Sequence, residues 1–222
     1  MIYAAHLLVF ALAQAAPAAS PTPEPAPTPK PAPAGPVVVL ETSMGTIKIG
    51  LHKDKAPISV DNFLKYVRER HYDGTIFHRV IPSFMIQGGG MDAQMTERKT
   101  RPAIKNEASN GLRNQRGTVA MARTTAPDSA TAQFFINLKD NLRLDYGMSG
   151  AGYAVFGEVL EGMEVVEKIA AVPTTSKGPH GDVPMLAILI KSAREVAAAP
   201  AAKPEAAPAA SPKPRPSASP KP

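Results

Sequence analysis

The distribution of proline divides this 222-residue chain into one stretch that is expected to fold and two that are not. Of 24 prolines, nine lie in residues 17–36 and eight in residues 200–222, which leaves seven for the middle. Both ends are otherwise rich in alanine and cannot bury enough apolar surface to offset the entropy lost on ordering. We therefore predict disordered Pro/Ala-rich segments at residues 16–36 and 195–222. Residues 37–194 are long enough to form one domain with a hydrophobic core.

The first 15 residues resemble a secretory leader. An apolar run at residues 7–12 precedes Ala13-Gln14-Ala15, which has the small-x-small pattern of a signal-peptidase site. The run is too short to span a bilayer, so we expect export with no stable membrane insertion after cleavage. No Lys or Arg precedes the run, and a cytosolic protein with an Ala-rich start is the alternative.

Charge and cysteine content exclude several function classes. Residues 37–194 carry 20 Lys and Arg against 16 Asp and Glu, a difference of +4 within the +6 of the whole chain. The charges are interspersed, without a basic run, so nucleic-acid binding is not expected. There is no cysteine, which excludes disulfides and thiol catalysis. The five histidines lack metal-ligand spacing, and we expect neither metal nor cofactor.

The apolar pattern predicts many short strands and two helices. Pro57 begins a helix with Val60, Phe63, Leu64 and Val67 on one face, and residues 162–170 form the second. Residues 88–116, rich in Gly and Asn, are predicted as a loop. The absence of a βαβ rhythm favours a mainly β fold, a closed antiparallel barrel capped by the two helices. The predicted strands are residues 37–41, 46–51, 75–80, 84–87, 118–122, 134–138, 154–159 and 185–191.

The run at residues 72–90, YDGTIFHRVIPSFMIQGGG, carries the main functional signal. It predicts two strands around a Pro82-Ser83 turn, with Arg79 beside an apolar floor. No nucleophile, metal cluster or phosphate loop lies nearby in the sequence. That combination suits a site that binds a neutral, apolar, carbonyl-bearing group such as a prolyl residue and breaks no bond.

Three blocks resemble the signatures of the cyclophilin-type peptidyl-prolyl isomerases: residues 77–89 (FHRVIPSFMIQGG), residues 117–122 with 133–137 (GTVAMA and QFFIN), and residues 153–159 (YAVFGEV). Their order and spacing agree, and the resemblance extends over residues 37–193. Residues 106–114 and 172–174 resemble the bacterial envelope branch. The resemblance implies an eight-stranded barrel, prolyl isomerase activity and a periplasmic or cell-envelope location.

The implied reaction is rotation of an X-Pro peptide bond, which is slow because amide resonance is lost in the twisted state. The catalyst has to bind the twisted imide better than either planar form. By the resemblance, Arg79 is the hydrogen-bond donor, and Gln87 and Gln133 hold the substrate backbone and orient Arg79. Ala122 and Arg123 offer backbone groups, and Tyr153 lines the groove where a histidine often stands. The resemblance also implies that the prolyl ring is held by Phe84, Met85, Phe135 and Leu144.

Strand alternation allows only one of Phe134 and Phe135 to face this groove, and it assigns His78 to the face opposite Arg79 and a structural role. The expected partners are proline-containing polypeptides folding in the envelope, and the protein is expected to be a monomer. The alternative function is a proline-peptide-binding chaperone or scaffold module whose isomerase activity is incidental. An intact Arg79 favours the enzyme, because binding alone would tolerate its loss.

Overall fold

The computed structural model describes residues 35–196. The predicted leader lies outside the described residues, as do most of the 16–36 linker and of the 195–222 tail. The described part holds two α-helices and one short 3-10 helix, and none of them is long and apolar enough to cross a membrane.

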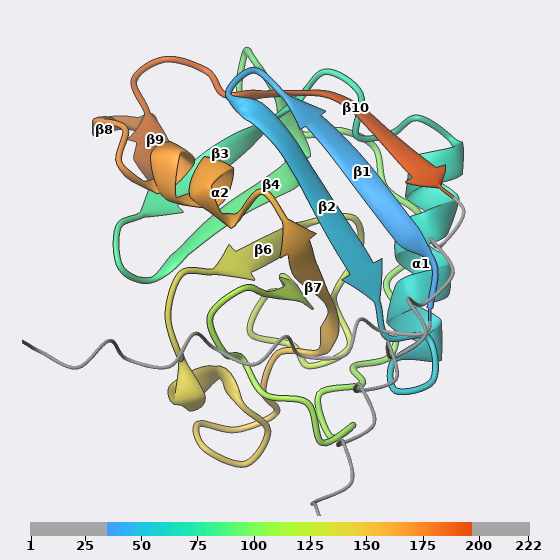
Figure 1. The fold of residues 1–222 in the computed structure, drawn as a ribbon. Helices are drawn as coiled ribbons and strands as arrows, with labels where there is room; N and C mark the ends of the chain where they lie inside the picture. Colours follow the sequence, from blue (N-terminus) through green and yellow to red (C-terminus); the bar gives the residue numbers. More distant parts are fainter. Residues whose placement is uncertain (1–34, 197–222) are drawn as a thin grey trace, which may run out of the picture. The chain divides into compact units, whose positions relative to one another are not determined.

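Eight antiparallel strands close into a barrel, in the order β1-β10-β3-β4-β6-β5-β7-β2 (Figure 1). This confirms the predicted mainly β fold with an eight-stranded antiparallel barrel and two helices. The barrel strands are β1 (Val37–Thr42), β2 (Gly45–Leu51), β3 (Thr75–Ile81), β4 (Met85–Asp92), β5 (Thr118–Met121), β6 (Phe134–Asn137), β7 (Val155–Glu161) and β10 (Leu189–Val196). The remaining elements are α1 (Pro57–Arg68), η1 (Leu142–Leu144), α2 (Met163–Ala170), β8 (Thr174–Lys177) and β9 (His180–Pro184).

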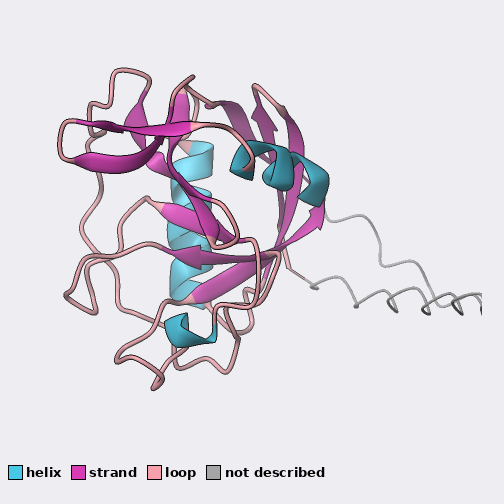
Figure 2. Ribbon diagram, turned by 90° about the vertical axis from the view of Figure 1, so that its left-hand side faces the viewer, coloured by secondary structure: helices cyan, strands magenta, loops and turns pink. Residues whose placement is uncertain are grey.

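The two helices lie on opposite sides of the barrel in Figure 1, with α1 next to β10 and α2 next to β2. Helix α1 begins at Pro57, whose missing N–H is no loss in the first turn. The four predicted apolar residues of α1 are all buried. Phe63 contacts the rings of Tyr72, Phe134 and Phe156 at centroid distances of 5.1 to 5.5 Å. In Figure 2 this longer helix is seen behind the strands.

Three segments differ from the sequence prediction. Strand β4 continues to Asp92, through the glycines that were interpreted as the start of a loop. The β8–β9 hairpin was not predicted. Strand β10 begins at Leu189 rather than residue 185, and it ends at Val196, two residues inside the predicted tail.

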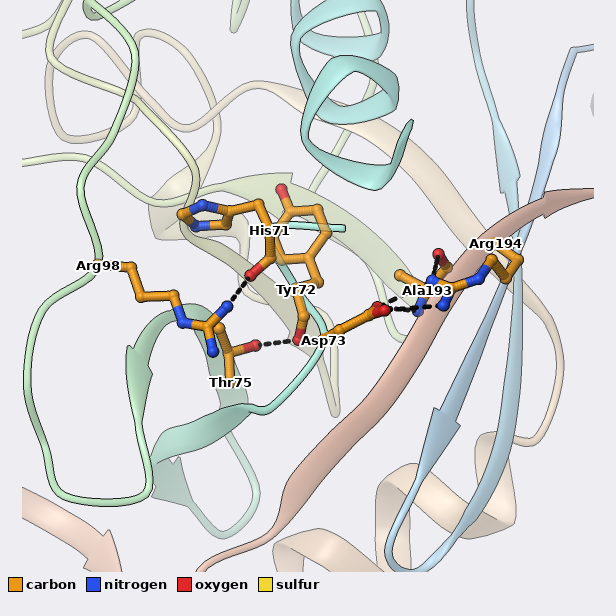
Figure 3. A network of polar contacts seen from close by, with 7 residues as sticks. All are labelled: His71, Tyr72, Asp73, Thr75, Arg98, Ala193 and Arg194. Carbon is orange, nitrogen blue, oxygen red and sulfur yellow. Dashed lines mark hydrogen bonds and ion pairs between the residues drawn. The ribbon is translucent and has the colours of Figure 1, made fainter. Parts of the chain in front are cut away.

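A polar network holds the turn that enters β3 (Figure 3). Both carboxylate oxygens of Asp73 accept hydrogen bonds from the guanidinium of Arg194, at 2.8 and 2.7 Å, and one also accepts from the Ala193 N–H. Arg98 donates to the His71 carbonyl at 2.7 Å. These bonds tie the start of β3 to β10 and thereby position the strand that carries Arg79.

Candidate active site

One cavity of about 110 Å³ brings together nine of the ten residues that the sequence predicted for the site. It is lined by Arg79, Phe84, Met85, Gln87, Ala122, Arg123, Phe135, Leu144 and Tyr153. The tenth residue, Gln133, lines an adjoining pocket that shares Gln87, Ala122 and Arg123 with this cavity. We call the nine-residue cavity the proline pocket.

Three neighbouring strands place the central groups of the pocket in one row. Arg79 on β3 is the register partner of Gln87 on β4, and Gln87 is also the partner of Phe135 on β6. Residues directly opposite each other in an antiparallel ladder project from the same face of the sheet. A cation, an amide and an aromatic ring therefore lie side by side.

A bulge in β3 gives Arg79 its direction. Phe77 pairs with Gly88 and Arg79 pairs with Gln87, so His78 is an extra residue on β3. Phe77 is fully buried in the main core, whereas the Arg79 side chain is 44% exposed. Without the bulge these two residues would share a face. Simple alternation therefore does not assign His78 to a face, and its place opposite Arg79 stays a prediction.

The apolar floor of the proline pocket is a small second core, separate from the one inside the barrel. Met85 and Phe135 are buried in it with Ala120 and Val155, and Phe84 and Leu144 pack against them. The neighbouring Phe134 belongs to the main core. This confirms that only one of the two adjacent phenylalanines faces the groove.

The partner of Arg79 was not predicted. Its Nε lies 3.6 Å from Oδ2 of Asp182 on β9, and both side chains are about half exposed. Gln87, which was expected to orient Arg79, instead donates from Nε2 to Oε1 of Gln133 at 2.8 Å. Asp182 has a positive φ of 58°, a conformation that Asp tolerates better than most residues. The glycines and proline at residues 178–181 were the available turn signal for this hairpin.

Arg123 and Tyr153 form one wall of the pocket. The Arg123 guanidinium carbon lies 4.4 Å from the centroid of the Tyr153 ring, and Nε donates to the Gly152 carbonyl at 2.8 Å. The Tyr153 ring also meets Phe135 edge to face at 5.6 Å. Arg123 thus contributes its side chain, which the sequence did not predict. The Ala122 N–H donates to the Gln133 carbonyl, so this backbone group is not free to bind a substrate.

His78 is buried beside the site and is neutral at physiological pH. Its pKa is lowered to about 4, mainly by burial and also by the neighbouring His180 and Arg79, against the opposing effect of hydrogen bonds with the Ile76 backbone and Gln133. Its Nδ1 is the one buried side-chain polar atom without a hydrogen-bond partner in the described part of the chain. The permanent cations that line the proline pocket are therefore Arg79 and Arg123.

The arrangement suits the binding of a small apolar group. A half-exposed guanidinium and an amide face a pocket whose floor is made of apolar side chains. Within residues 35–196, no group of three or more His, Asp or Glu is placed to hold a metal ion. The pocket offers a hydrogen-bond donor beside a space for a small apolar ring.

The comparisons with known proteins identify the family of the chain. The family model described as "Cyclophilin type peptidyl-prolyl cis-trans isomerase/CLD" matches residues 37–195. Peptidyl-prolyl cis-trans isomerase A of Dickeya dadantii is 56% identical over 157 residues, which cover 71% of this chain and 83% of that protein. Peptidyl-prolyl cis-trans isomerase B of Escherichia coli is 54% identical over 159 residues, 70% of this chain and 97% of that protein.

A solved structure has the same fold. The Cryptosporidium parvum cyclophilin-type isomerase, determined in the presence of the dipeptide Ala-Pro, aligns with a TM-score of 0.58 at 26% identity, over 71% of this chain and 96% of that one. The family match spans nearly all of the barrel that carries the proline pocket. The chain belongs to the cyclophilin-type peptidyl-prolyl cis-trans isomerases and is an isomerase of that class.

Proposed function

We propose that this isomerase accelerates X-Pro rotation in folding polypeptides by stabilising the twisted imide non-covalently, with Arg79 as the donor and the proline pocket as the binding site. The observation that carries the proposal is the row of Arg79, Gln87 and Phe135 on three adjacent strands. The row sets a permanent cation next to an apolar floor.

The pocket floor would hold the prolyl ring and exclude water from one side of the imide. In the twisted state the prolyl nitrogen loses its resonance with the carbonyl and becomes a better hydrogen-bond acceptor. A guanidinium is charged at any physiological pH and offers several N–H groups in one plane. A donor held in place before the reaction stabilises this state more than either planar form. An acceleration of about 10⁵ would require about 7 kcal/mol from these effects together.

The substrate class follows from the pocket and from a relative. Prolyl rings fit an apolar pocket with one charged edge, and one family structure was determined with Ala-Pro present. We propose proline-containing polypeptides, with small residues before proline accepted, as the substrates of this chain.

The test is an exchange assay on a short Ala-Pro peptide, followed by NMR, comparing the native protein with Arg79→Ala. Loss of one preorganised donor lowers kcat by about 100-fold in comparable sites. The matched control is Arg68→Ala. Arg68 lies on α1 and, like Arg79, pairs with a carboxylate: its guanidinium is 2.9 Å from Oε2 of Glu195. Arg68→Ala should keep native activity.

The proposed mechanism fails if folded Arg79→Ala retains native activity. Arg79→Lys keeps the charge but loses the planar donor set, so an activity between those of the native protein and Arg79→Ala would show that geometry contributes beyond charge. If the native protein binds the peptide without accelerating exchange, the peptide-binding module replaces the enzyme mechanism.

A further inference from the structure

Three large apolar side chains are exposed together in η1 and in the loop that follows it. Leu142, Tyr146 and Met148 are 45%, 61% and 64% exposed, and all three line one open groove with Leu112 and Arg113. Single exposed apolar residues are ordinary, but a group of them around a groove is typical of an interaction site. We call this surface the loop groove. The short helix η1 lies among the loops at the lower edge of Figures 1 and 2.

The loop groove is continuous with the proline pocket. A third groove lies between them and is lined by Phe84, Leu142 and Leu144, among others. Phe84 and Leu144 belong also to the proline pocket, and Leu142 belongs also to the loop groove. The three grooves therefore adjoin, and an extended chain bound at the proline pocket would reach the loop groove by passing Leu144 and Leu142.

A buried asparagine network fixes the two surfaces relative to each other. Asn141 donates from Nδ2 to the Phe84 carbonyl at 2.9 Å and to Oδ1 of Asn137 at 2.8 Å. Asn114 donates from its N–H and its Nδ2 to Oδ1 of Asp145, at 2.7 and 3.1 Å. The Asn141 N–H donates to the Asn114 carbonyl at 2.7 Å. The network thus holds the loop next to the pocket, and the apolar side chains are presented to solvent by a fixed backbone.

We propose that the loop groove binds an apolar segment of the same unfolded polypeptide whose proline occupies the proline pocket. The inference rests on the proposed function. Two linked contacts on one chain act together, because the second forms at a high effective concentration once the first is made. Unfolded proteins, which expose apolar segments, should therefore be better substrates than short peptides, through a lower KM.

The experiment uses the double variant Tyr146→Ser with Met148→Ser. The matched control is Met185→Ser with Leu186→Ser, because these residues are also exposed and apolar, at 57% and 85%, but lie between β9 and β10. Each protein is assayed on a short Ala-Pro peptide and on an unfolded protein whose refolding is limited by prolyl isomerisation. Binding of a permanently unfolded protein is measured separately by fluorescence anisotropy.

The expected result is native activity of the loop-groove variant on the short peptide, and about a five- to tenfold fall in kcat/KM on the unfolded protein, carried by KM. The control variant should match the native protein in both assays. Equal losses in both variants would overturn the inference, since nonspecific contact with any exposed apolar residue would explain them. An unchanged KM for the unfolded protein, or a loss on the short peptide as well, would also overturn it.

Failure of the proposed function would look different. In that case the native protein would not accelerate exchange of the short peptide. The anisotropy measurement would still test the loop groove, because weaker binding by the loop-groove variant alone requires no catalysis.

Discussion

Gly90 on β4 lies against the side chain of Gln133, which is the hydrogen-bond partner of Gln87 in the candidate active site. A Cβ added at this position would lie 2.5 Å from both Cγ and Nε2 of Gln133, closer than two such atoms can approach. The obstruction is a flexible side chain rather than backbone, so Gly90→Ala should move Gln133 and break its 2.8 Å hydrogen bond from Gln87. A hydrogen bond of this kind contributes about 0.5–1.5 kcal/mol to the order of the site. We expect a similar amount to be lost from stabilisation of the transition state, which would lower kcat/KM about two- to tenfold.

The stability of Gly90→Ala should stay within about 1 kcal/mol of the native value, because the added methyl also restricts the unfolded chain. The adjacent Gly89→Ala should behave in the opposite way. Gly89 has φ of +84°, and its Cβ would lie 2.7 Å from the buried Tyr72 ring. Backbone strain and overpacking together should lower the free energy of unfolding by about 2–4 kcal/mol.

Gly111→Ala separates these two contributions. Gly111 has a similar φ of +81°, but a Cβ there would have no neighbour within 4 Å, so this variant shows the strain alone. Urea unfolding gives the stabilities, and peptide exchange at matched folded concentration gives the activities. Native activity in Gly90→Ala, or native stability in Gly89→Ala, would refute the reasoning.

Three further predictions concern charges near β3. Burial lowers the pKa of His78 from 6.5 to about 4, so as pH falls the unfolded chain takes up the proton before the folded protein does. The free energy of unfolding should therefore fall by about 3 kcal/mol as pH drops from 6.5 to about 4. In urea titrations His78→Gln should make the free energy of unfolding less dependent on pH. Hydrogen bonds from Arg194 lower the pKa of Asp73 below 3.8, so Asp73→Asn should destabilise near neutral pH and match the native protein in acid below the lowered pKa, as thermal melts would show. The half-exposed ion pair of Asp182 with Arg79 contributes about 1 kcal/mol or less, so Asp182→Asn should lower kcat/KM less than fivefold and weaken its dependence on salt; a loss above tenfold would contradict this.

Local patterns in the sequence predicted most of the barrel. The β1–β2 hairpin, helix α1 and the strand containing Arg79 each depend on contacts within one segment, and periodicity and turn residues report such contacts. Seven of the nine residues of the proline pocket lie within the three motif blocks, Arg123 directly follows one of them, and only Leu144 lies apart. Their catalytic roles stay predictions.

The features that were missed depend on contacts between segments distant in the sequence. Glycines at residues 88–90 look like a loop, but Gly88 is needed where a Cβ would lie 2.9 Å from the Phe77 ring. The bulge at His78 exists only in the pairing of β3 with β4. Asp182 reaches Arg79 because the β8–β9 hairpin packs against β3. The periodicity of apolar residues within one segment carries no information about such packing between segments.

The pairing of the first and last barrel strands determines how the domain would respond to a pulling force. Val37 at the start of β1 is the register partner of Val196 at the end of β10. A force applied through the two chain ends would therefore separate these strands from one end and load their hydrogen bonds one pair at a time. Because the bonds would not share the load, the barrel should open at low force when stretched, however stable it is in solution.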